Sequence, residues 1–146
     1  MNRDLLLDTS VLLKWFHHDG EDEVEQAEWH LHAHRQGVIR ANVLDLGLYE
    51  LGNVLVRPLK RSAEQATAVL TATVTLCGPP LTLDITGLAA AADTACSEGL
   101  TFYDAAFVAA AEAHDCTLIS ADNQLVATGH AITLTQSMEQ FRREQD

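Results

Sequence analysis

Four acidic residues of this chain lie in segments where carboxylates are uncommon. Each interrupts or directly follows a run of apolar or tightly built sequence, and the four are Asp8, Glu50, Asp104 and Asp122. A lone carboxylate beside a core carries a desolvation penalty, so such groups usually have a partner or bind a cation. If the four converge, they describe a site for hard divalent ions, because Mg²⁺ and Mn²⁺ prefer oxygen ligands.

Such a carboxylate cluster suits the hydrolysis of a phosphodiester. It can hold one or two ions that generate hydroxide and stabilise the leaving oxygen, so no side-chain nucleophile is needed. Bound cations would also offset the repulsion among the carboxylates and attract a phosphate group. The sequence therefore predicts metal-dependent phosphodiester hydrolysis, provided that the fold brings the four acids together.

Each acid also has an ordinary structural interpretation. Asp8 and Asp104 could cap helices, in the second case as part of a capping box. Asp122 could start a turn, and Glu50 could pair with Arg57 or a more distant base. Four such coincidences in one small chain are improbable, and this favours a common site.

The elements that must position these acids follow from the hydrophobic pattern. Short apolar runs alternate with amphipathic segments, which predicts an α/β fold with a mainly parallel sheet. Residues 5–7 are apolar without alternation, as in a strand buried on both faces. The other expected strands are 38–40, 81–83, 117–120 and 132–134. The expected helices are 11–16, 23–35, 45–57, 62–77, 86–98, 101–113 and a terminal helix from Ser137.

This arrangement predicts convergence of the acids. Asp8 and Asp122 each follow an expected strand, and open α/β sheets bind ligands just outside the carboxyl ends of their strands. Asp104 lies near the start of its helix, and Glu50 lies one turn into its own. If the two strands are parallel neighbours, their terminal carboxylates face one crevice and the two helices lean toward it.

Length and composition are those of a globular chain. With 146 residues and 47% apolar side chains, the simplest organisation is one domain spanning residues 1–146. The first apolar stretch is too short and too interrupted for a membrane span or a cleavable signal, which favours a cytoplasmic protein. The three cysteines are odd in number and widely spaced, as expected for free thiols.

The net charge limits how a nucleic acid could bind. Nine basic and 21 acidic residues give −12, and this field repels phosphate over most of the surface. An RNA substrate would therefore need bound cations and a local basic patch. Arg57, Lys60 and Arg61 form the densest basic run, and Lys14 is a further candidate; a solvated helix junction is the alternative interpretation of the run.

A histidine pair offers a competing metal site. His30 and His34 share one face of an expected helix at a spacing that could hold a transition metal. No acid or cysteine completes the set nearby. We therefore favour a solvated helix face.

Four segments together resemble the motifs of PIN-domain ribonucleases. They are Leu-Asp-Thr-Ser-Val-Leu at 7–12, Tyr-Glu-Leu-Gly-Asn-Val-Leu at 49–55, Leu-Thr-Phe-Tyr-Asp-Ala-Ala at 100–106 and Leu-Ile-Ser-Ala-Asp-Asn at 118–123. They occur in the family's order and cover nearly the whole chain. Its length is similar to that of the VapC-like toxins of bacterial toxin–antitoxin pairs.

The resemblance implies a three-layer α/β/α sandwich with a five-stranded, mostly parallel sheet. It also implies an Mg²⁺- or Mn²⁺-dependent endoribonuclease that acts on RNA, forms a homodimer and has an antitoxin partner. The four acids would be its catalytic, metal-binding residues. Thr9, Ser10 and Ser120 would orient their carboxylates. Trp15 and Phe16 are expected to be core or dimer residues, although aromatics near this point of VapC-like proteins can face a helix of the antitoxin.

Rival interpretations remain in three classes. A haloacid-type phosphatase wants a second acid two residues after the first, where this chain has Ser10. A receiver domain wants a lysine at a late strand end, and the only lysines are Lys14 and Lys60. A PIN domain could also serve in housekeeping RNA processing, or as a non-catalytic binding module, without being a toxin.

Overall fold

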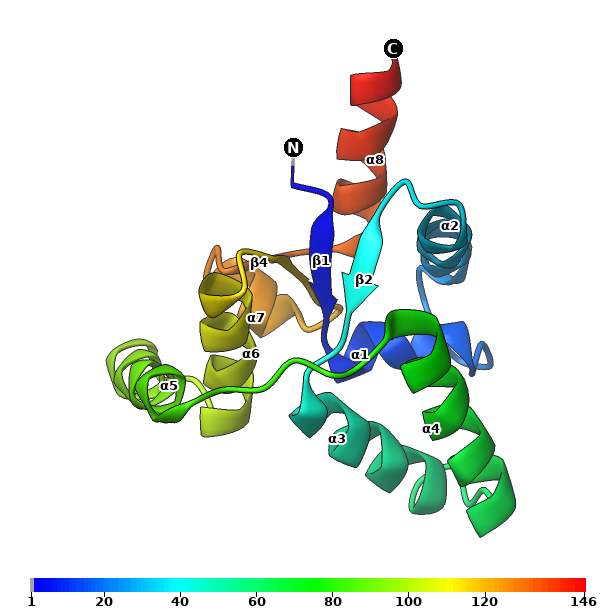
Figure 1. Ribbon diagram of the computed structural model, residues 1–146, viewed down its shortest axis with the longest axis horizontal. Helices are drawn as coiled ribbons and strands as arrows, with labels where there is room; N and C mark the ends of the chain where they lie inside the picture. The colour runs from blue at the N-terminus through cyan, green and yellow to red at the C-terminus, as the bar shows by residue number, and fades with distance from the viewer. Residues whose placement is uncertain (1) are drawn as a thin grey trace.

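The sheet is parallel and has strands ordered β2-β1-β3-β4 (Figure 1). The structure, a computed structural model, describes residues 2–146. The strands are β1 (Asp4–Leu7), β2 (Arg40–Asn42), β3 (Thr117–Ile119) and β4 (Ala131–Ile132). Because β1 and β3 are adjacent, their carboxyl ends lie side by side, as the sequence predicts for Asp8 and Asp122.

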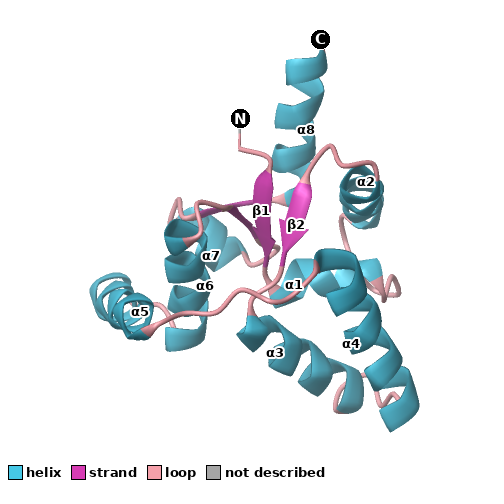
Figure 2. Cartoon of the chain, viewed as in Figure 1, coloured by secondary structure: helices cyan, strands magenta, loops and turns pink. Residues whose placement is uncertain are grey.

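Helices make up most of the remaining chain (Figure 2). They are α1 (Thr9–Leu12), the 3₁₀ helix η1 (Leu13–Trp15), α2 (Val24–Arg35), α3 (Asp45–Val56), α4 (Ala63–Cys77), α5 (Ile85–Glu98), α6 (Phe102–Ala113), α7 (Asn123–Ala127) and α8 (Leu134–Gln145). Within residues 2–146, no helix combines the length and the apolar character needed to cross a membrane.

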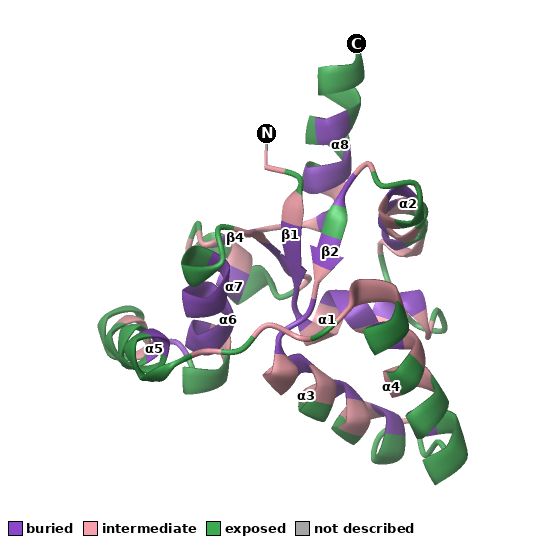
Figure 3. Cartoon of the chain, viewed as in Figure 1, coloured by how far each residue is buried: buried purple, intermediate pink, exposed green. Residues whose placement is uncertain are grey.

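The side chains of β1 alternate between two hydrophobic clusters, one on each face of the sheet. Leu5 and Leu7 join a cluster built with α1, α2, α3, α4 and α8. Leu6 joins a second cluster built with α5, α6 and α7. All three leucines are at most 1% exposed, and the buried layer on either side of the sheet is visible in Figure 3. This arrangement confirms the three-layer α/β/α prediction.

The sheet has four strands in the described chain, not the five that we expected. The segment predicted as a strand at 81–83 forms a single parallel bridge, from Leu81 to Leu44 beside β2. Pro79 and Pro80 precede it and cannot donate to a ladder. Asp84 then accepts from the Gly87 amide at 2.8 Å and caps α5, so too few extended residues remain for a strand.

Two element boundaries differ from prediction for reasons of helix capping. Strand β2 begins two residues late, because the Val38 amide donates back to the Ala33 carbonyl at 2.9 Å and closes α2. Helix α8 starts at Leu134 rather than Ser137, because Thr133 forms a reciprocal capping box with Gln136. Ser137 is consequently a buried residue within the helix.

His30 and His34 of α2 are structural, which corrects the expectation that this pair lies on a solvated face. His30 is fully buried; its Nδ1 lies 2.7 Å from the Gln26 carbonyl and its Nε2 lies 2.8 Å from Ser137 Oγ. His34 Nδ1 accepts from the Ala41 amide at 3.1 Å, and Nε2 lies 2.6 Å from the Leu76 carbonyl. Both rings thus tie α2 to its neighbours and have no lone pair free for a metal.

Candidate functional site

Asp8 lies where β1 ends and α1 begins. Its amide donates to the Ile119 carbonyl at 3.1 Å, which continues the pairing of β1 with β3. Its Oδ1 accepts from Ser10 Oγ at 2.5 Å and from the Val11 amide at 3.2 Å. The residue is 7% exposed. Asp8 therefore caps α1 while it presents a buried carboxylate at the carboxyl end of the sheet.

The electrostatics of Asp8 are unfavourable for a charged group. Burial raises its pKa above the ordinary value, because desolvation penalises the anion. Hydrogen bonds from Ser10, Ser120 and the Val11 amide lower the pKa and offset part of that effect. The negative charge of Asp104 raises it further. The hydrogen bonds compensate only part of the cost of burying this negative charge, which makes the Asp8 carboxylate a candidate ligand for a cation.

Asp104 and Asp122 extend the acidic site from a neighbouring helix and strand. Asp104 is in the first turn of α6, where its amide donates to Thr101 Oγ1 at 3.1 Å. Burial raises the pKa of Asp104, and the charge of Asp122 raises it further. Asp122 is exposed just beyond β3, and its Oδ1 accepts from the Gln124 amide at 2.9 Å as the cap of α7. Asp104 thus lies within electrostatic reach of both Asp8 and Asp122.

Glu50 reaches the same end of the sheet from α3. Its Oε1 accepts from Thr9 Oγ1 at 2.7 Å, and Thr9 directly follows Asp8. The alternative pairing with Arg57 does not form among the described residues. The half-buried glutamate is therefore held by a hydroxyl and joined to the other acids through α1.

Two serines connect the ends of β1 and β3. Ser10 Oγ donates to Asp8 and accepts from the Ala121 amide at 3.0 Å. Ser120 is fully buried; its Oγ accepts from the Asp122 amide at 3.0 Å, and its side chain also hydrogen-bonds Asp8. Together with Thr9, these hydroxyls fix the backbone and the carboxylates around the site.

The donor set fits a hard divalent cation by its chemistry, since all four acids offer oxygen atoms. Among residues 2–146, however, no three or more His, Cys, Asp or Glu side chains are grouped closely enough to hold a metal ion as they stand. Carboxylates that raise one another's pKa also repel one another, which opposes closer approach. The four acids therefore match a hard cation in donor chemistry but are not gathered into one ligand group among the described residues.

The basic candidates divide into exposed and buried residues. Arg57, Lys60 and Arg61 are exposed where α3 ends. Lys14 is buried, because its Nζ donates to Glu21 Oε1 at 3.2 Å and to the Asp22 carbonyl at 2.6 Å. This placement contradicts the expectation that Lys14 contacts RNA.

The two aromatic candidates for an antitoxin contact lie on the inner side of η1. Trp15 is 8% exposed, donates from Nε1 to the Ala27 carbonyl at 3.1 Å and stacks on His34. Phe16 is half-buried and packs against the same core. Trp15 therefore holds α2 in place, and a partner helix could reach Phe16 alone of this pair.

A depression beside Glu50 contains residues that the sequence analysis missed. Its volume is about 400 Å³, and it is lined by Thr9, Tyr49, Glu50, Asn53, Val54 and Tyr103. Tyr49 is 79% exposed and Tyr103 is 60% exposed. Each tyrosine directly precedes an acid of the site, and this spacing was a signal available in the sequence.

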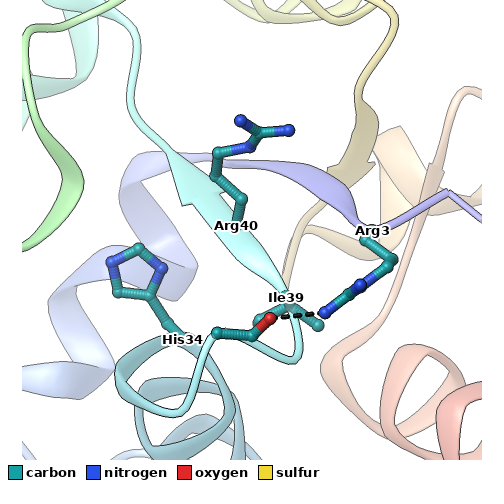
Figure 4. A pocket seen from close by; sticks show the side chains of 5 residues that line it. Arg3, His34, Ile39 and Arg40 are labelled. Carbon is teal, nitrogen blue, oxygen red and sulfur yellow. Dashed lines mark hydrogen bonds between the residues drawn. The ribbon is translucent and has the colours of Figure 1, made fainter.

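Another depression, lined in part by basic residues, lies at the opposite, amino end of the strands (Figure 4). Arg3 and Arg40 line it, but neither guanidinium is free. Arg3 donates to the Gly37 carbonyl, and also to the Val38 carbonyl at 2.6 Å, while Arg40 pairs with Asp4. These contacts are structural, and the acidic end remains the candidate site.

Comparisons with known proteins identify the family of this chain and structures with a similar fold. The family model described as "PIN domain" matches residues 5–131. A structure titled "Crystal structure of PAE2754 from Pyrobaculum aerophilum" aligns over 98% of this chain and 99% of that one, with a TM-score of 0.68 and 23% identity. "Crystal Structure of FitAcB from Neisseria gonorrhoeae" aligns over 88% and 95%, with a TM-score of 0.63 and 17% identity. A search of curated proteins gives no match. The chain belongs to the PIN domain family.

Proposed function

We propose that this chain is an Mg²⁺- or Mn²⁺-dependent endoribonuclease and the toxin of a VapBC-type toxin–antitoxin pair. The family match supports nuclease chemistry, because PIN domains are generally nucleases. The proposal rests on the position of three acids at one end of the sheet, where Asp8 follows β1, Asp122 follows β3 and Asp104 lies in the first turn of α6. The pKa of Asp8 is raised in part by Asp104, and the pKa of Asp104 in part by Asp122.

Asp8, Glu50, Asp104 and Asp122 would hold the cation. Such an ion supplies Lewis-acid chemistry, making water a better nucleophile and withdrawing charge from the phosphate. The chain's part is to keep the carboxylates oriented: Ser10 and Ser120 fix Asp8, and Thr9 fixes Glu50. Asp8 and Asp104 must lose their protons to bind a cation, so affinity should fall as pH falls toward their raised pKa values.

The RNA backbone would be held by the basic run at the end of α3. Arg57, Lys60 and Arg61 are exposed in the segment that directly follows α3, the helix that carries Glu50. Their charges act against a net charge of −12, so the contact should weaken strongly with salt. Lys14 has no part in this proposal because it is buried in an ion pair.

The toxin assignment adds further proposals. An antitoxin would bind near the first motif, with Phe16 as the remaining aromatic contact of the predicted pair. The active form would be a homodimer, and it would act in the cytoplasm, where RNA and antitoxin meet. Co-expression of the chain with the product of a neighbouring reading frame, followed by co-purification, tests the partner.

One cleavage assay tests the central proposal. Purified protein should cut single-stranded RNA with Mg²⁺ or Mn²⁺ and stop when a chelator is added. Asp8→Asn and Asp104→Asn should abolish cutting, whereas the matched control Asp93→Asn, exposed on α5, should retain it. Metal-independent cutting, or full activity in both site variants, overturns the proposal.

A non-catalytic RNA- or protein-binding module is the second candidate. The observation that favours it is that the acids of residues 2–146 do not form a compact metal-holding group as arranged. Titration calorimetry with Mn²⁺ separates the two functions. Binding in the wild type that is lost in Asp8→Asn supports the nuclease, and absence of binding in both supports the module.

A further inference from the structure

Both tyrosines of the chain border the acidic site with their rings exposed. The sequence contains two tyrosines, Tyr49 on α3 and Tyr103 on α6. They come from different helices, yet they line one depression together with Glu50 and Thr9. At 79% and 60% exposure, they are among the most solvent-accessible large apolar side chains of the described chain.

The surroundings leave the ring faces available. Neither tyrosine takes part in a stacked ring pair within residues 2–146, where the ring contacts are made by Trp15, Trp29 and their partners. Asn53, one helical turn after Tyr49, is also exposed and adds an amide with two donors and an acceptor to the same depression. An aromatic ring can stack on the face of a nucleobase, and a neighbouring amide can hydrogen-bond the edge of that base.

The exposed face of α3 leads from this depression toward the basic run in the sequence. On α3, Tyr49, Asn53 and Val56 are exposed at helical spacing, and Arg57 and Lys60 follow them. One surface of the helix thus leads from the acids, past an aromatic ring and an amide, to positive charge. Proteins that bind single-stranded nucleic acid combine these two elements, aromatic platforms for bases and cations for the backbone.

We propose that Tyr49 and Tyr103 form a stacking platform for one unpaired base of single-stranded RNA, next to the phosphate that meets the acids. Asn53 contacts the edge of that base. The proposal deepens the proposed ribonuclease function and rests on it for the identity of the ligand. A duplex cannot use this platform, because its bases are already stacked and paired.

The small number of tyrosines allows a direct binding test. Protein with isotope-labelled tyrosine rings is titrated with a short single-stranded RNA in the presence of chelator, so that the readout does not depend on cleavage. We expect both tyrosine ring signals to shift upfield through base ring currents. An otherwise identical oligonucleotide without bases, or the matching duplex, should leave them unchanged.

Variants provide the second readout. Tyr49→Leu and Tyr103→Leu should each lower kcat/KM on single-stranded RNA by roughly five- to a hundredfold, the range for one base–aromatic stack. Tyr49→Phe and Tyr103→Phe should keep near-normal activity, because the ring is retained. Phe102→Leu is the matched control: Phe102 is 44% exposed beside Tyr103 and lines only the adjoining depression, which Tyr103 also borders, and not the one that holds Tyr49 and Glu50.

The outcomes separate this proposal from the proposed function. Ring shifts without any RNA cutting would support the platform and overturn the nuclease. Cutting without base-dependent ring shifts, or unchanged kcat/KM in both leucine variants, would overturn the platform and leave the nuclease. If Tyr103→Leu instead turns a dimer into a monomer while each protomer cuts normally, the tyrosines serve an interface between copies and the platform is refuted.

Discussion

Replacing Asp8 by asparagine should stabilise the metal-free protein near neutral pH. The carboxylate is 7% exposed, and burial together with the charge of Asp104 raises its pKa. Asparagine keeps an oxygen that can accept from Ser10 Oγ and the Val11 amide, so the cap of α1 survives. It removes the buried negative charge and thus the repulsion from Asp104. The same substitution should abolish cation-dependent cleavage.

The size of the gain follows from proton linkage. Between 3.8, the ordinary pKa of Asp, and the raised value, the folded protein holds a proton on Asp8 that the unfolded chain has lost. The stability contributed by protonated Asp8 is therefore present at low pH and declines as pH rises through this window. The advantage of Asp8→Asn should grow by about 1.4 kcal/mol for each unit by which the folded pKa exceeds the unfolded one.

Urea unfolding in chelator from about pH 3 to pH 7 measures this difference. The free energies of unfolding of the wild type and Asp8→Asn should diverge in favour of the variant as pH rises and then stay parallel. Asp93→Asn, an exposed neutralisation on α5, should show no such divergence. A variant less stable than the wild type by more than about 1 kcal/mol at neutral pH would refute the reasoning and make Asp8 a structural cap. Added Mn²⁺ should stabilise only the wild type.

Three further predictions concern other buried or half-buried groups. Burial lowers the pKa of His30 below its ordinary value of 6.5, so as the pH falls through that value the unfolded chain binds a proton before the folded protein does. The folded state should therefore lose stability below this pH. Thermal melting should show a smaller loss of stability with falling pH for His30→Gln than for the wild type. Ser10→Ala removes the acceptor of the Ala121 amide and should cost about 1–3 kcal/mol in urea unfolding. Burial raises the pKa of the Cys77 thiol to about 12, so iodoacetamide at mildly alkaline pH should label exposed Cys96 first, as mass spectrometry can check.

The sequence predicted the central strand pair better than the edges of the fold. Asp8 and Asp122 were expected at the carboxyl ends of neighbouring parallel strands, and β1 and β3 are paired in that way. This was predictable because apolar runs and helical periodicity define which elements exist, and parallel connection then fixes which ends share an edge. The prediction of a fifth strand at 81–83 was wrong, because a short apolar run beside prolines does not show whether it pairs with another strand.

The burial of the histidines could not be predicted from their own helix. His30 is satisfied by Ser137, 107 residues away in the sequence, and His34 by backbone groups of β2 and α4. The sequence around a residue does not reveal hydrogen-bond partners that come close only through tertiary packing. Lys14 was misassigned for a related reason: its partners Glu21 and Asp22 lie in the following loop, which folds back over η1. Charge alone does not separate a buried ion pair from an exposed phosphate contact.

The acidity of the surface and the acidity of the site have different consequences. In the proposed ribonuclease, a net charge of −12 would slow the approach of RNA, and salt should act on RNA binding through the exposed basic run. The raised pKa values of Asp8 and Asp104 instead act locally and set the proton competition for a cation. Raising the salt concentration should therefore weaken RNA binding far more than it weakens Mn²⁺ binding. Lowering the pH should weaken Mn²⁺ binding far more than it weakens RNA binding. Parallel calorimetric titrations with Mn²⁺ and with RNA would refute this separation if both ligands responded alike to both changes.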